Sequence, residues 1–223
     1  MDLLYRVKTL WAALRGNHYT WPAIDITLPG NRHFHLIGSI HMGSHDMAPL
    51  PTRLLKKLKN ADALIVEADV STSDTPFANL PACEALEERI SEEQLQNLQH
   101  ISQEMGISPS LFSTQPLWQI AMVLQATQAQ KLGLRAEYGI DYQLLQAAKQ
   151  QHKPVIELEG AENQIAMLLQ LPDKGLALLD DVLMHQRNLA WRDKLRAMPP
   201  GRYVVAVGAL HLYGEGNLPQ MLR

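Results

Sequence analysis

The chain has 223 residues, of which 46% are hydrophobic and 19% are charged. This length suits one globular domain, and the composition excludes a disordered chain. The formal net charge is −3 and no basic stripe is present, so a nucleic-acid partner is not indicated. Cys83 is the one cysteine, which excludes an internal disulfide and a cysteine-based zinc site.

The first 15 residues are apolar with scattered positive charge. Their uninterrupted apolar run, Leu10–Leu14, is too short for a signal peptide, and no run in the chain approaches the roughly 20 residues that span a bilayer. We predict an amphipathic helix that packs on the body of the protein, with a role at a membrane surface as the alternative. We expect a cytoplasmic protein that does not associate with a membrane. A periplasmic or membrane-associated location is the alternative.

Five short runs are predicted to be strands. Residues 23–28 and 33–37 alternate in polarity on either side of Gly30-Asn31, which predicts a hairpin. Three continuous apolar runs follow at residues 63–67, 155–158 and 203–207. Continuous apolar strands separated by helices favour an α/β fold, with a mixed, largely parallel central sheet that helices flank on both faces.

Several helices have recognisable ends. Thr52 is predicted to cap one helix, and Ser91 with Gln94 forms a capping box for another that Gly106 ends. Further helices are expected over residues 116–133, 141–153 and 161–198, the last with a break near Pro172.

We expect a single domain over residues 1–223. Residues 72–132 carry no strand signal. They are predicted to form a helical insertion that caps the strand ends.

One short motif occurs twice, each time after a predicted strand. Gly38-Ser39-Ile40-His41 follows the second strand and Gly208-Ala209-Leu210-His211 follows the last one. A glycine at the end of a strand permits a sharp turn or a close approach to a ligand. The motif therefore places a histidine just outside the carboxyl edge of the sheet, where open parallel sheets bind ligands.

Carboxylates follow two other strands at the same edge. Glu67 ends the third strand, with Asp69 two residues later, and Glu159 follows the fourth strand. Two histidines with one or two carboxylates suit a divalent metal, or acid–base chemistry without a metal.

Each of these residues also has an ordinary structural explanation, because a carboxylate at a strand end often caps the next helix. His33 and His35 share one face of a strand, and we expect an exposed or hydrogen-bonded surface there. The tryptophans at helical positions are expected in packing roles. The sequence contains no Gly-x-Gly-x-x-Gly, Walker A or Gly-x-Ser-x-Gly pattern, so neither a nucleotide cofactor nor a serine nucleophile is indicated.

Motifs from residue 35 to residue 218 resemble those of the TraB/GumN (Tiki-like) family. They are the paired Gly-x-x-His motifs, Ile65-Val66-Glu67-Ala68-Asp69, Gly139-Ile140-Asp141, Leu158-Glu159, Arg187-Asn188 and the closing stretch 207–218. The family is related to the Tiki proteins and is similar in its core to erythromycin esterases.

The resemblance implies a hydrolase of the metallopeptidase or esterase kind, with a peptide or small-molecule substrate. Tiki members are described as needing manganese or cobalt, whereas the esterase relatives use histidine and glutamate without a metal. The resemblance assigns His41, His211 and Glu67 as metal ligands, and Glu67, Glu159 and Arg187 as catalytic residues.

The remaining motif residues have supporting roles in this interpretation. Gly38 and Gly208 shape the turns, Asp69 and Asp141 orient site groups, and Asn188 holds the helix geometry beside Arg187. Asp141 capping its own helix is the alternative. Arg187 could stabilise an oxyanion or bind a substrate carboxylate.

The chain departs from the family after its fourth predicted strand. The run from Glu159 to Arg187 is shorter than in most members. The helical stretch is either naturally shorter in this chain, or a segment near Asp180-Asp181 is missing.

We therefore expect a hydrolase that cleaves a peptide or ester bond, using a divalent metal (manganese, cobalt or zinc) or a His/Glu acid–base site. The alternative is a non-catalytic peptide-binding or regulatory protein that uses the same cleft. A metal-storage or haem-handling protein is a weaker alternative, because the sequence lacks a Cys/Met ligand cluster.

Overall fold

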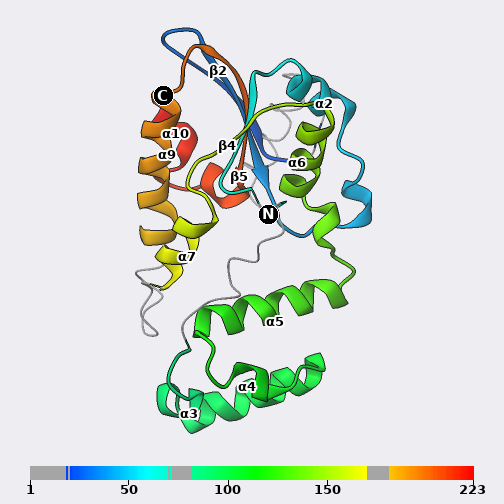
Figure 1. The fold of residues 1–223 in the computed structure, drawn as a ribbon, viewed down its shortest axis with the longest axis vertical. Helices are drawn as coiled ribbons and strands as arrows, with labels where there is room; N and C mark the ends of the chain where they lie inside the picture. Colours follow the sequence, from blue (N-terminus) through cyan, green and yellow to red (C-terminus); the bar gives the residue numbers. More distant parts are fainter. Residues whose placement is uncertain (1–18, 20, 70, 72–81, 170–180) are drawn as a thin grey trace, which may run out of the picture.

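A five-stranded sheet forms the centre of the molecule (Figure 1). The structure, a computed structural model, describes residues 19, 21–69, 71, 82–169 and 181–223. The strands lie in the order β1-β2-β5-β3-β4. Their bounds are Ala23–Leu28 (β1), Arg32–Ser39 (β2), Ala63–Val66 (β3), Val155–Glu157 (β4) and Gly201–Gly208 (β5).

Helices connect the strands and cover both faces of the sheet. The α-helices are Thr52–Lys59 (α2), Leu86–Arg89 (α3), Glu92–Met105 (α4), Leu117–Lys131 (α5), Ile140–Gln150 (α6), Ala161–Leu169 (α7), Arg187–Arg196 (α9) and Leu218–Leu222 (α10). Short 3-10 turns are η1 (His45–Met47), η2 (Pro109–Phe112), η3 (Ala136–Tyr138) and η5 (Ala209–Leu212), and η4 (Asp181–Gln186) is a π-helical turn. No helix in the described part of the chain has the length and apolar character needed to cross a membrane.

The predicted hairpin is confirmed. β1 and β2 pair antiparallel, from Leu28 opposite Arg32 to Ala23 opposite Ile37. The turn residues Gly30 and Asn31 both have positive φ, 80° and 59°. A tight hairpin needs this backbone conformation, which glycine and asparagine adopt at low cost.

The other strand pairs are parallel, which confirms the α/β class with a mixed, largely parallel sheet. β5 pairs with both β2 and β3, and β4 pairs with β3. β3 is buried along its whole length, as are the five residues 203–207 of β5. Helices on both faces explain why these strands are continuously apolar.

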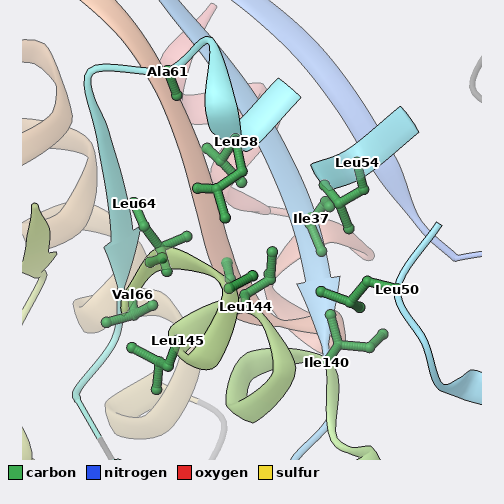
Figure 2. Packing of buried hydrophobic residues seen from close by; sticks show 14 of the residues in the cluster. Ile37, Leu50, Leu54, Leu58, Ala61, Leu64, Val66, Ile140, Leu144 and Leu145 are labelled. Carbon is green, nitrogen blue, oxygen red and sulfur yellow. The ribbon is translucent and has the colours of Figure 1, made fainter. Parts of the chain in front are cut away.

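Each face of the sheet has its own hydrophobic core. On one face α2 and α6 pack over the sheet through residues labelled in Figure 2, among them Leu54, Leu58, Leu144 and Leu145. On the other face α9 and α10 pack over it through Trp191, Leu195, Leu218 and Leu222.

α3, α4 and α5 lie beyond the carboxyl edge of the sheet (Figure 1), and we call them the helical tier. The tier has a small core of its own, formed by Leu86, Phe112 and Ile120. Residues 82–132 contain no strand, as expected for the described part of the predicted insertion.

Two helix ends test the capping predictions. The capping box of Ser91 and Gln94 is present, and Gly106 ends α4 in the left-handed conformation with φ 73°. The predicted Thr52 cap is wrong, because Pro51 occupies the cap position and Thr52 is the first residue of α2. The predicted amino-terminal helix and the break near Pro172 lie outside the described residues.

Candidate active site

The two Gly-x-x-His motifs begin side by side on neighbouring strands. β2 and β5 run parallel, with Gly38 opposite Val207 and Ser39 opposite Gly208. A Cβ on Gly38 would lie 2.6 Å from Pro22 Cγ and 3.0 Å from Ala209 Cα. This close packing explains why glycine stands at the strand end.

The loop after β2 is fixed against the start of α6. Ile140 N donates to Ile40 O at 3.1 Å, and Gly43 forms an isolated bridge with Arg135. A Cβ on Gly139 would lie 2.5 Å from the backbone oxygen of His41. The loop therefore holds His41 close to the first turn of α6.

His41 pairs with Asp141 in this arrangement. Its Nδ1 hydrogen-bonds to the Asp141 carboxylate, while 72% of the His41 side chain is exposed and 12% of the Asp141 side chain is. The hydrogen bond to Asp141 raises the pKa of His41 above its usual value, although burial acts in the opposite direction. A carboxylate can only accept, so Nδ1 carries the proton and the lone pair of neutral His41 lies on Nε2.

His211 lies on the other face of the sheet and is only 3% exposed. Its Nδ1 is 2.7 Å from Asn188 Oδ1, and its ring centroid is 4.4 Å from that of Trp191. Burial lowers the pKa of His211 to about 4, so the ring is neutral at pH 7. Nδ1 donates to the amide oxygen, which leaves Nε2 as an acceptor facing Arg187 Nη1 at 3.3 Å.

Arg187 joins the two strand-end glutamates. Its Nη2 donates to Glu67 Oε2 at 2.6 Å and also to Glu159, and its Nε donates to Glu159 Oε2 at 3.1 Å. All three side chains are largely buried. Burial alone would lower the pKa of Arg187, but the hydrogen bonds and charges of Glu159 and Glu67 raise it. The guanidinium therefore stays charged and is shared by the two carboxylates.

Glu67 also connects this cluster to the second glycine motif. Gly208 N donates to Glu67 Oε1 at 2.5 Å, and His211 Nε2 lies 4.0 Å from the same oxygen. A Cβ on Gly208 would lie 3.3 Å from Oε1, so the glycine permits this approach. We call Glu67, Glu159, Arg187 and His211 the carboxylate–arginine cluster.

Two members of the site were not singled out from the sequence. Gln164 Nε2 donates to Glu159 Oε1 at 2.8 Å. Trp191 Nε1 donates to Glu159 Oε2 at 3.3 Å, and Arg187 stacks on the Trp191 ring at 4.5 Å from its centroid. The spacing from Arg187 to Trp191, four residues on one helix, is a signal that could have found the tryptophan.

The supporting residues divide into two groups. Asn188 contacts His211 and also donates to Gly216 O at 3.0 Å, while Asp141 contacts His41. Asp69 Oδ1 accepts from the backbone and the hydroxyl of Ser71. The geometry therefore gives Asp69 a role in the turn after β3.

The donor atoms as arranged do not fit a divalent metal. Both oxygens of Glu67 accept from N–H groups, and His211 Nε2 faces the guanidinium of Arg187. Among the residues that the structure describes, no three His, Cys, Asp or Glu side chains are close enough together to hold an ion. A metal bound to His41, His211 and Glu67 would require Arg187 to move.

Comparison with known proteins gives the family of the chain. The profile of the TraB/PrgY/gumN family matches residues 23–177 and 173–223. Proteins called YbaP, described as uncharacterised, from Escherichia coli K12 and Shigella flexneri are each 84% identical over 264 positions, covering 100% of both chains. No solved structure matches the chain.

These matches also bear on the departure expected between Glu159 and Arg187. The alignments extend over 264 positions, whereas this chain has 223 residues, so the chain lacks positions that both relatives have. The family profile divides at residues 173–177, within the same interval. The family match covers every strand and helix described above. The chain therefore belongs to the TraB/PrgY/gumN family.

Proposed function

We propose that this protein is a hydrolase of peptide or ester bonds in which His41 activates water. The observation that carries the proposal is the His41–Asp141 pair, an exposed imidazole whose inner nitrogen is fixed by a carboxylate. This arrangement sets the tautomer of a general base and stabilises the imidazolium that forms.

The proposed step begins with water hydrogen-bonded to His41 Nε2. The water oxygen bonds to the substrate carbonyl carbon while its proton passes to Nε2. The tetrahedral intermediate then collapses, the bond to the leaving nitrogen or oxygen breaks, and the proton on Nε2 passes to the leaving group. A carboxylic acid and an amine or alcohol are released.

The carboxylate–arginine cluster supports this proposal through the electrostatic effect of its charges on His41. The charges of Glu67 and Arg187 both act on the pKa of His41. In the proposed enzyme, Glu67 stabilises the imidazolium by its negative charge. Arg187 would stabilise the oxyanion if one of its contacts with a carboxylate is exchanged for the substrate.

The test is hydrolysis of p-nitrophenyl esters and fluorogenic dipeptide amides by the protein and by three variants. His41→Gln should lower kcat/KM by about 100-fold or more, since it removes the base. Asp141→Asn should lower the maximum rate and shift the rising limb of the pH profile to lower pH, because Asp141 raises the pKa of His41. His100→Gln, on the exposed face of α4, is the matched control and should retain full activity.

Full activity in His41→Gln on a substrate that the wild-type protein cleaves would disprove the assignment of the base. Binding of a peptide without cleavage, unaffected by Glu67→Gln, would instead support the peptide-binding alternative. Titration of manganese, cobalt and zinc into chelator-treated protein tests the metal-dependent version. Tight binding of one of these ions that is lost in both His41→Ala and His211→Ala would support the metal-dependent version, in which Arg187 moves to admit the ion.

A further inference from the structure

A pocket of about 450 Å³ lies at the opposite end of the strands that carry the histidine motifs. It is formed between α2 and the first part of the sheet, on the face that α2 covers. Its lining comes from β1, the first half of β2, α2 with the two residues after it, and the start of β5. Its volume is in the range typical of sites for small molecules.

The lining of this pocket includes four Lys or Arg residues, of which three are Arg53, Lys56 and Arg202. Arg53 and Lys56 lie three residues apart on α2, so they project from the same side of the helix, and Arg202 comes from β5. Within the described part of the chain, none of these three side chains has a hydrogen-bond or ion-pair partner. Three positively charged residues of the pocket lining are therefore without a counter-ion among the described residues.

The acidic residue in the lining is already neutralised. Asp25 accepts from Lys57 Nζ at 2.8 and 2.9 Å, and from His35 at 2.6 Å. Asp62 lies near Arg202, but in an adjoining hollow, where its carboxylate accepts from the backbone of Arg202 at 2.7 Å. The pocket thus keeps a positive potential after both carboxylates are counted.

The floor of the pocket is fixed by a buried polar network. His35 is only 5% exposed, and its two ring nitrogens contact Tyr19 Oη at 2.5 Å and Asp25 at 2.6 Å. Beside this network lie the buried apolar residues Ala61 and Val204. A fixed floor with an apolar part and a basic rim favours a ligand that is anionic at one end and apolar at the other.

We propose that this pocket binds a small organic anion, whose phosphate or carboxylate group contacts Arg53, Lys56 and Arg202 and whose apolar part lies on the floor. The site is distinct from the candidate active site. His33 and His41 are eight residues apart along β2 and its loop, which corresponds to roughly 25 Å of extended chain. The proposal therefore does not depend on the proposed hydrolase activity.

The test is calorimetric titration of the full chain with phenyl phosphate and benzoate, with phenol and inorganic phosphate as partial probes. At least one of the two complete probes should bind more tightly than both partial ones, and the preference between them identifies the anionic group. Lys56→Gln and Arg202→Gln should each weaken binding about tenfold, the loss expected for one charge-assisted contact. Lys59→Gln is the matched control, since it removes the same charge from the same helix outside the pocket.

Two results would overturn the proposal. One is no heat of binding from phenyl phosphate or benzoate at millimolar concentration. The other is an equal loss of affinity in Lys56→Gln and Lys59→Gln, which would show general attraction to a basic helix. Arg202 lies on β5 rather than on α2. Weaker binding in Arg202→Gln therefore cannot result from a local change in α2.

Discussion

At the scale of single residues, Arg187 keeps two largely buried carboxylates close together. Its guanidinium donates to both Glu67 and Glu159. Removal of one partner from a buried ion pair leaves an uncompensated charge, which costs about 3–5 kcal/mol. Arg187→Met should therefore lower the free energy of unfolding by about 3 kcal/mol in urea denaturation at pH 7.

The control for this prediction is a triple variant with Arg187→Met, Glu67→Gln and Glu159→Gln. It should recover most of the lost stability, because no buried charge remains without a partner. An equal loss in the single and triple variants would show that Arg187 stabilises the fold by packing on Trp191.

His211 makes the stability depend on pH. The unfolded chain takes up a proton at this ring below pH about 6.5, whereas burial lowers the folded pKa to about 4. The free energy of unfolding should therefore fall as the pH drops from about 6.5 to about 4, by up to roughly 3 kcal/mol from this residue. Urea denaturation at several pH values measures this dependence. Between pH 6.5 and pH 4, the free energy of unfolding should fall less in His211→Gln than in the wild type or in His100→Gln.

The sequence predicts which residues reach the carboxyl edge, but only part of their arrangement. Glu67 and Glu159 meet because the parallel strands β3 and β4 end at one edge, and Arg187, at the start of α9, donates to both. His41 and His211 turn to different partners, Asp141 and Asn188, because the loop after β2 packs on α6 while η5 packs on α9. Which face each loop takes depends on tertiary packing, and the local sequence does not contain that information.

At the scale of elements, the loop after β2 depends on a close contact with the start of α6. Gly139 has an ordinary φ of −61°, yet a Cβ there would lie 2.5 Å from the backbone oxygen of His41. Gly139→Ala should therefore destabilise the protein by about 2 kcal/mol and displace His41. Thermal denaturation and amide NMR shifts of the loop would measure both effects.

Gly133→Ala provides the contrast. Gly133 has a φ of 84°, but a Cβ there would meet nothing within 4 Å. That substitution should cost only about 1–2 kcal/mol of backbone strain and leave the loop shifts unchanged. Equal changes of the His41 amide NMR shift in Gly139→Ala and Gly133→Ala would contradict the proposed contact.

The elements themselves could be predicted where one local signal decides them. A continuous apolar run identifies β3, and the Ser91–Gln94 capping box identifies the start of α4. The start of α2 was missed by one residue, because Pro51 has the extended conformation of a cap residue without a side chain that accepts a hydrogen bond. A helix start without a capping side chain is therefore harder to predict from the sequence.

At the scale of the whole molecule, the helical tier has a core separate from the two cores of the sheet. Regions with few buried apolar contacts open more readily than the main core. Amide hydrogen exchange should therefore be faster in α4 and α5 than in β3 and β5. Phe112→Ala removes the largest side chain of the tier core, so it should raise the exchange rates of α4 and α5 further above those of β3 and β5. An equal rise of the exchange rates in β5 would contradict this prediction.

The position of β5 has a consequence for synthesis of the protein. β5 is the last strand in the sequence, yet it lies between β2 and β3 and pairs with both. While the chain emerges from the ribosome, β1–β2 can close as a local hairpin, but β2 and β3 each keep an open hydrogen-bonding edge until residues 201–208 appear. Nascent chains halted before Gly201 should therefore be sensitive to protease and depend on chaperones, and the sheet should become protected in one step once β5 has left the exit tunnel.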